Sequence, residues 1–223
     1  MPMNCDIKAY PNVILFDWDG TLVSTLKLLF NAHNYVREHL EYPLWSVKEA
    51  RKNIRLSAKD AFPQLYGDNA HKALELYYDY VRANHLNKLE PCSGAKNLLE
   101  ELAHKEKPLG IISNKKHDIL EKEIKYLDWN KYFTTWVGAG NAKRDKPDPA
   151  PVNKALADLN YYSSSEQVWY VGDTKEDMKT AYLAGITPIF VEHGFGDKHE
   201  LSNEYNIQSY ENLEALSRHL SKF

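Results

Sequence analysis

Short apolar runs recur along the chain, and most of them stop at glycine or polar residues. Five such runs are predicted as strands, at residues 13–16, 109–112, 134–137, 168–171 and 186–191. A compact apolar run that ends in this way is typical of a strand buried on both faces. Pro188 interrupts the fifth run, which indicates an edge or late strand.

Between these runs, apolar residues recur at the spacing of one helix face. The predicted helices cover residues 95–105, 118–127, 149–159, 177–184 and 212–220. Ser93 is predicted to cap the first helix, and Gly185 to end the fourth. Strands that alternate with helices indicate an α/β fold with a parallel sheet covered on both faces. Ligands of such sheets bind at the carboxyl ends of the strands.

Residues 25–89 depart from this alternation, because they contain no strong strand candidate. Two sets of residues follow helical spacing instead: Leu26, Leu29, Phe30, His33, Val36 and Leu40, then Leu74, Tyr77, Tyr78 and Val81. The pattern predicts a small helical module inserted after the first strand. We interpret its histidine and tyrosines as packing residues rather than ligands.

Composition narrows the classes of function. The 223 residues include 28 Lys plus Arg and 31 Asp plus Glu, so the net charge is −3 and no broad basic surface for nucleic acid or membrane is expected. Cys5 and Cys92 lie far apart, which disfavours a disulfide scaffold or a cysteine zinc site. No signal-peptide pattern or membrane-length apolar run is visible. We therefore expect a cytoplasmic protein, and its oligomeric state is open.

Two carboxylates follow the first predicted strand, in the motif Asp17-x-Asp19-Gly20-Thr21. Residues two apart in an extended segment point to the same side, so both carboxylates face one pocket. Like charges this close are costly unless a cation or a shared proton compensates them. Carboxylate oxygens suit Mg²⁺, which predicts a magnesium site. A helix-capping aspartate followed by a turn is the alternative.

Three further polar motifs fall at the ends of predicted strands or in the loops after them. They are Ser113-Asn114, Lys146-Pro147-Asp148-Pro149 and Gly172-Asp173-Thr174-x-x-Asp177. They offer an anion-binding pair, a lysine in a proline-stiffened loop, and a carboxylate that could complete a metal shell. Each also has an ordinary explanation as a helix cap, a solvated lysine, or an acid at a helix N-terminus. The coincidence of all four motifs favours one common site.

In this order, the motifs D-x-D-G-T, S-N, K-P and G-D-x-x-x-D resemble those of the haloacid dehalogenase superfamily of phosphotransferases, over residues 13–190. The chain looks most similar to the phosphoglycolate-phosphatase-like and β-phosphoglucomutase-like branch, which carries a helical cap between the first two motifs. Ser113 follows Asp17 by 96 residues, whereas Lys146 follows Ser113 by 33. The resemblance implies a Rossmann-like α/β core at residues 1–24 and 90–223, with an α-helical cap domain at residues 25–89.

The resemblance also implies roles for the motif residues. Asp17 would be the nucleophile that forms a phosphoaspartyl intermediate, and Asp19 the general acid and then the general base. Mg²⁺ would be bound by the Asp17 side chain, the Asp19 backbone carbonyl and Asp173. The other implied residues bind the phosphate (Ser113, Asn114 and Lys146) or support the site from behind (Thr21 and Asp177). An acid at position 19 favours phosphate esters over the dehalogenase and phosphonate-cleaving relatives, which lack it.

The resulting hypothesis is a Mg²⁺-dependent phosphatase for a small phosphorylated metabolite, phosphoglycolate-like or a sugar phosphate. Two alternatives stay open: a phosphosugar mutase of the β-phosphoglucomutase type, and a non-catalytic binding module on the same fold. The cap is expected to set specificity, with Arg55 or Lys59 as candidates to bind a second anionic group. Solvent-exposed helix charges are the alternative for both. Arg51 would share a face with Arg55 on a continuous helix.

Overall fold

A computed structural model describes residues 10–87, 89–163, 167–201 and 207–223. At its centre lies a parallel six-stranded sheet in the order β5-β4-β1-β6-β7-β8. The strands are β1 (Val13–Phe16), β4 (Leu109–Lys116), β5 (Thr135–Ala139), β6 (Val168–Gly172), β7 (Thr187–Val191) and β8 (Gln208–Tyr210). The predicted α/β class and parallel sheet are therefore confirmed.

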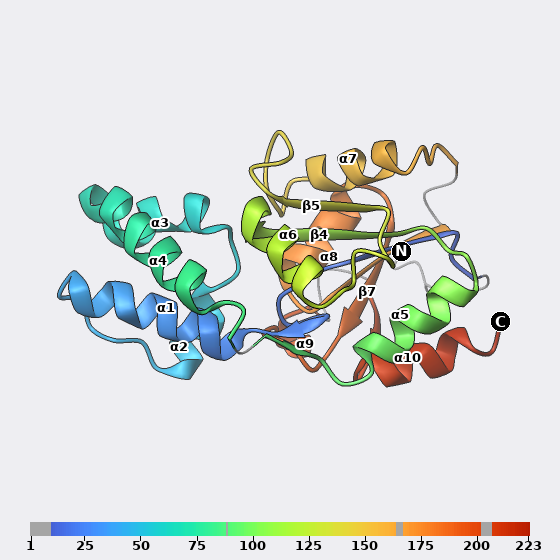
Figure 1. The fold of residues 1–223 in the computed structure, drawn as a ribbon, viewed down its shortest axis with the longest axis horizontal. Helices are drawn as coiled ribbons and strands as arrows, with labels where there is room; N and C mark the ends of the chain where they lie inside the picture. Colours follow the sequence, from blue (N-terminus) through green and yellow to red (C-terminus); the bar gives the residue numbers. More distant parts are fainter. Residues whose placement is uncertain (1–9, 88, 164–166, 202–206) are drawn as a thin grey trace.

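Alternate residues of β1 enter two separate cores on opposite faces of the sheet. Ile14 and Phe16 pack on the face covered by α5 (Ala95–His104), α6 (His117–Tyr126) and α10 (Leu213–Leu220). Val13 and Leu15 pack on the other face, against α7 (Ala150–Asp158) and α8 (Lys175–Leu183). In Figure 1, α7 lies above the sheet, whereas α5 and α10 lie below it. All four residues of β1 are buried, as expected for a central parallel strand.

Two details of the sheet differ from the prediction. The strand predicted to stop at residue 112 continues to Lys116, with a register shift between Ile112 and Lys116. Of the two alternatives for the fifth strand, β7 is a late strand and not an edge strand, because β8 pairs with it on the side away from β6. Pro188 is tolerated because the β8 ladder begins only at Ile189, so the missing amide hydrogen breaks no bond on that side.

The start of α5 also differs from the prediction. Its N-cap is Gly94 in the left-handed region (φ 77°), with no side-chain capping bond. The Ser93 hydroxyl donates instead to Glu214 Oε1 at 2.6 Å, which ties this turn to α10. Gly185 ends the fourth predicted helix as expected, at φ 69°.

A helical module lies between the short antiparallel strands β2 (Val23–Ser24) and β3 (Glu90–Pro91). Its elements are α1 (Leu26–His39), α2 (Val47–Asn53), α3 (Ala58–Tyr66), the 3₁₀ turn η1 (Gly67–Asn69) and α4 (Ala70–Asn84). In Figure 1 this module projects from one end of the sheet. His33 is buried against the rings of Trp45, Phe62 and Tyr77, so it packs as its spacing predicted.

Across the described ranges, no helix combines the length and the apolar character needed to cross a membrane. Cys92 is a free cysteine, and burial raises the pKa of its thiol to about 12. Cys5 lies outside the described residues, so the cysteine prediction is observed only for its second member.

Candidate active site

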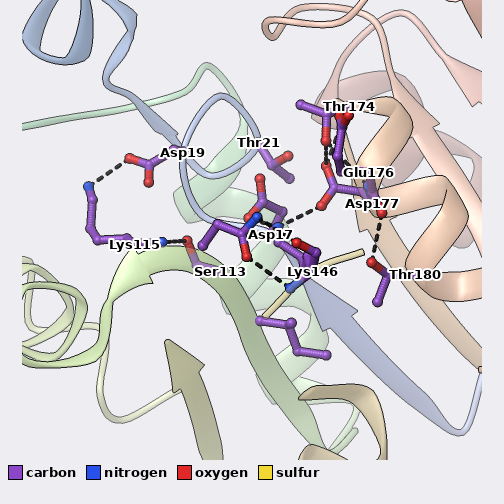
Figure 2. A network of polar contacts seen from close by, with 12 residues as sticks. Asp17, Asp19, Thr21, Ser113, Lys115, Lys146, Thr174, Glu176, Asp177 and Thr180 are labelled. Carbon is purple, nitrogen blue, oxygen red and sulfur yellow. Dashed lines mark hydrogen bonds and ion pairs between the residues drawn. The ribbon is translucent and has the colours of Figure 1, made fainter. Parts of the chain in front are cut away.

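The motif residues converge because their strands are neighbours in the sheet. Asp17 follows β1, Asp173 follows β6, and Ser113 lies near the end of β4. β4, β1 and β6 are adjacent and parallel, so their carboxyl ends meet at one edge. Lys146 reaches the same point from the loop after β5, as Figure 2 shows.

Lys146 is the electrostatic centre of this cluster. Its ammonium lies 2.7 Å from Asp17 Oδ1 and 2.6 Å from Asp177 Oδ1. Burial alone would lower the pKa of Lys146, but the two carboxylates raise it above its ordinary value. The lysine therefore stays charged beside the Asp17 carboxylate.

Asn114 fixes the backbone of Lys146. Its Oδ1 accepts from Lys146 N at 3.0 Å, and its Nδ2 donates to Lys146 O at 3.1 Å and to Arg55 O at 3.2 Å. The sequence suggested that this amide binds phosphate with Ser113. In the structure the amide joins the Lys146 loop to the helical module, and its phosphate-binding role stays a prediction.

Asp177 serves two purposes that the sequence offered as alternatives. It is the third residue of α8 and forms a reciprocal capping box with Thr174. Its other oxygen accepts from Lys146 and, at 3.0 Å, from the Tyr170 hydroxyl. Asp177 is therefore both a helix cap and the anchor of the lysine.

Asp173 lies in a cradle of small residues. Its Oδ1 accepts from Thr21 Oγ1 at 2.8 Å, and its Oδ2 accepts from Phe195 N at 2.6 Å. A Cβ on Gly20 would lie 2.5 Å from Asp173 Oδ2, and a Cβ on Gly194 would come closer still. Gly20 also has a φ of 86°, which glycine adopts at little cost. Thr21 thus holds the Asp173 carboxylate, and its supporting role in a catalytic site stays a prediction.

Three buried carboxylates meet here, and their charge is only partly compensated. Oxygens of Asp17, Asp173 and Asp177 lie within 4.8 Å of one another. Burial, followed by the charge of Asp177, raises the pKa of Asp17 well above its usual value and that of Asp173 to about 7. A cation between the carboxylates would reverse this penalty.

This donor set fits Mg²⁺, a hard ion that prefers oxygen ligands. Asp177 is already occupied by four donors, from Lys146, Tyr170 and Thr174. Asp17 and Asp173 are therefore the side chains that would hold the ion. Figure 2 shows the Asp19 side chain turned away from this cluster, so only its backbone is available there.

A second buried network holds Asp19, and its other members were not among the residues predicted from the motifs. Lys115 Nζ lies 2.6 Å from Asp19 Oδ1 and 2.6 Å from Glu123 Oε2. One signal was available: Glu123 falls on the apolar face of its helix with Ile119 and Leu120, where a charged residue is unusual. Its partner could not be read from the spacing, because the pair joins β4 to α6.

A pocket opens in front of the carboxylates, between the helical module and the sheet. From the module it is lined mainly by apolar residues and by one cation: Leu29, Ile54, Arg55, Leu56, Ala58, Tyr77, Tyr78 and Val81. Arg55 thus reaches the pocket, whereas Lys59 lines a neighbouring groove beside Lys146. α2 ends at Asn53, so Arg51 and Arg55 do not share a continuous helix.

Comparison with known proteins gives one consistent family. A family model described as haloacid dehalogenase-like hydrolase matches residues 14–191. A pyrophosphatase PpaX from Halalkalibacterium halodurans is 26% identical over 175 residues, which are 78% of this chain and 80% of that protein.

Solved structures agree with this result. A hydrolase of the haloacid dehalogenase-like family from Streptococcus pneumoniae superposes with a TM-score of 0.80 at 27% identity, covering 94% of this chain and 98% of that one. A predicted phosphoglycolate phosphatase from Haemophilus somnus has a TM-score of 0.80 at 19% identity, covering 95% and 98%, and supports the fold.

Proposed function

Because the chain belongs to the haloacid dehalogenase-like hydrolase family, we propose that it is a Mg²⁺-dependent phosphatase that forms a phosphoaspartyl intermediate on Asp17. The single observation that supports this most is the position of Asp17. It follows the central strand, faces the pocket, and has a charged lysine 2.7 Å from one carboxylate oxygen. Its other oxygen has no hydrogen-bond donor among the residues that the structure describes.

The proposed reaction has two steps. In the first, an Asp17 oxygen attacks phosphorus, the bond from phosphorus to the ester oxygen breaks, and Asp19 protonates the departing alcohol. In the second, water attacks the phosphorus of the acyl phosphate while Asp19 accepts its proton. Inorganic phosphate leaves, and the Asp17 carboxylate and the Asp19 acid are both regenerated.

The other residues place charged and polar groups around the reacting phosphate. We assign Ser113 and Lys146 to the transferring phosphoryl oxygens, and Asp177 to holding Lys146 in place. Asp17 and Asp173 would hold Mg²⁺, and Thr21 would orient Asp173. When bound, the ion supplies positive charge that reduces repulsion between the phosphate and the nucleophile.

The substrate proposed is a small organic phosphate. The pocket wall combines apolar side chains such as Leu29, Leu56 and Val81 with cations. Arg55 is a candidate for a second anionic group, although its charge also offsets the burial that raises the pKa of Glu176. Lys59 lies in the adjoining groove and would reach only a longer substrate. Phosphoglycolate, sugar phosphates and pyrophosphate all belong in the test panel.

The first test replaces the nucleophile. Asp17→Asn keeps the size of the side chain and removes one buried negative charge, so the fold should survive. Phosphate release from the panel should fall by about three orders of magnitude or more, because the covalent route is lost. Asp128→Asn is a matched control, since Asp128 is exposed and its φ of 56° suits asparagine.

Three results would count against the proposal. Near-normal hydrolysis by Asp17→Asn would remove the nucleophile assignment. Full activity of the wild-type protein in EDTA would refute the proposed requirement for Mg²⁺. Conversion of a hexose phosphate to its isomer, primed by a bisphosphate and without net phosphate release, would replace the phosphatase by a mutase.

A further inference from the structure

A lysine outside the motifs is fastened to the carboxylate of Asp19. Lys115 Nζ lies 2.6 Å from Asp19 Oδ1 and 2.6 Å from Glu123 Oε2, and its side chain is 3% exposed. The Asp19 side chain retains 14% exposure, and both Asp19 and Lys115 line the pocket. Two short bonds fix the direction of the ammonium, and with it the Asp19 oxygen that it binds.

Glu123 anchors this lysine from the interior. Its Oε2 also accepts from the Trp18 indole at 2.6 Å, and its Oε1 lies 3.0 Å from His85 Nδ1. Since a carboxylate only accepts, His85 must donate through that nitrogen. Glu123 is completely buried, yet both its oxygens are satisfied.

The anchor holds the Asp19 segment at two points. Trp18 directly precedes Asp19 in the chain, and Lys115 binds the Asp19 side chain. His85 is the residue that ends α4, so the helical module contacts the same carboxylate. One buried glutamate thus contacts the side chain of the residue before Asp19, the lysine that binds Asp19, and the residue at the end of α4.

A purely structural ion pair explains this arrangement less well. Glu123 alone would neutralise Lys115, and burying a further carboxylate against the pair adds an uncompensated negative charge. Burial alone would lower the pKa of Lys115, but Asp19 and Glu123 together raise it. The ammonium contact therefore keeps one Asp19 oxygen occupied and leaves the other outside that contact.

We propose that Lys115 is a positioning residue for Asp19: it binds one carboxylate oxygen so that the other is aimed at the leaving group, and Glu123 fixes Lys115. This inference rests on the proposed phosphatase function and on the acid role of Asp19 within it. It predicts that replacing Lys115 lowers activity most for esters whose leaving group most needs a proton.

The test compares phosphate esters that differ in their leaving group. p-Nitrophenol leaves as a stable anion, whereas an alkyl alcohol requires a proton from the enzyme. Lys115→Met should reduce kcat/KM about 10²-fold or more for an alkyl phosphate and about tenfold or less for p-nitrophenyl phosphate. KM should change little, because Lys115 orients Asp19 rather than the phosphate. Lys125→Met is the matched control, since Lys125 is exposed and pairs with Glu121 on the helix of Glu123.

A double variant keeps the test decisive if Lys115→Met folds poorly. Lys115→Met combined with Glu123→Gln removes both buried charges and so avoids leaving a carboxylate unpaired. If Lys115 only stabilises the fold, the double variant should recover alkyl phosphate turnover together with thermal stability. If it positions Asp19, stability should recover and the selective loss should persist.

A cycle with Asp19→Asn completes the design. In that background Lys115→Met should cost no further activity, because the group it positions is already gone. An equal loss on both esters, or an additive loss in the Asp19→Asn background, would overturn the inference. The proposed function itself fails separately, if Asp17→Asn stays active on both esters.

Discussion

At the scale of single residues, two buried lysines repeat one arrangement. Lys146 lies between Asp17 and Asp177, and Lys115 lies between Asp19 and Glu123. In each trio one carboxylate faces the pocket, and the other is fully buried and saturated with donors. A single ammonium cannot neutralise two ionised carboxylates, so each trio is negative whenever both of its carboxylates are ionised. The trio around Lys146 also adjoins Asp173, which makes it the better place for a cation.

The excess charge predicts how the protein responds to Mg²⁺. Burial and the charge of Asp177 raise the pKa of Asp173 to about 7. A bound cation should therefore offset the cost of keeping this carboxylate ionised. Saturating Mg²⁺ should raise the melting temperature by several degrees over EDTA, since a ligand at about 100 times its Kd adds about 2.7 kcal/mol. The gain should be larger at pH 8 than at pH 6, because below about pH 7 protons compete for Asp173.

Calorimetric scans of the wild type and Asp173→Asn check this. The variant should lose the Mg²⁺-dependent shift while the Asp128→Asn control keeps it. A shift of equal size in Asp173→Asn would place the cation elsewhere.

The site residues that could be predicted from the sequence differ from the others in one physical respect. Asp17, Asp19 and Asp173 could be predicted because the end of an apolar run marks a strand end, and parallel strands bring their ends together. The use of Asn114 and Lys115 could not, because each depends on which loop or helix packs against β4. Nothing local in the sequence specifies that contact. The functional roles of all these residues remain predictions.

At the scale of elements, the helical module is organised around an aromatic cluster with a histidine at its centre. His33 from α1 contacts Phe62 of α3 and Tyr77 of α4, and Trp45 precedes α2. The Nδ1 of His33 is buried without a hydrogen-bond partner. Burial, followed by the charge of Arg37, lowers its pKa to about 3. The folded module therefore requires the neutral ring.

This predicts an acid-sensitive contribution to stability. The pKa of His33 is about 3 when folded and near 6.5 when unfolded, so the unfolded chain gains the proton first as pH falls. The contribution is complete above pH 6.5 and is lost progressively toward pH 3. Between pH 7 and pH 5 it amounts to about 2 kcal/mol in the free energy of unfolding.

Urea titrations of His33→Phe measure this contribution. The variant should lose about 2 kcal/mol less than the wild type between pH 7 and pH 5, because it has no ring to protonate. Exposed His71, replaced by Gln, should behave as the wild type does. Identical losses in His33→Phe and the wild type would mean that the His33 ring is not held neutral.

Most elements followed from the pattern, and the exceptions share a cause. β8 spans the sequence Gln208-Ser209-Tyr210, which has no apolar run, and β2 and β3 contain two residues each. Such strands form because a neighbouring strand offers backbone hydrogen bonds, whereas their own residues show little intrinsic preference for the β conformation. The extension of β4 to Lys116 has the same origin, since Lys116 pairs with Ala139 of β5.

At the scale of the whole molecule, the module and the sheet meet at the loop that holds Asp173. The Phe195 side chain packs in the module's apolar cluster, and its backbone amide donates to Asp173 Oδ2. Beside it, Arg51 of α2 donates to the Gly194 carbonyl at 2.8 Å. The position of the module is thereby connected to a residue proposed to bind the cation.

The last prediction follows from this connection. Phe195→Ala keeps the amide that binds Asp173 but removes the ring that seats the module, so the loop should be held less firmly. We expect the affinity for Mg²⁺, measured by calorimetric titration, to fall about 3- to 10-fold, a cost of about 0.7–1.4 kcal/mol. Arg51→Met should act in the same direction and more weakly, since it removes one hydrogen bond to Gly194. Exposed Phe223→Ala is the control for loss of an aromatic side chain. If Phe195→Ala lowered stability but left Mg²⁺ affinity intact, the loop would be rigid without the module. Motion of the module would then be unable to influence the carboxylate site by this route.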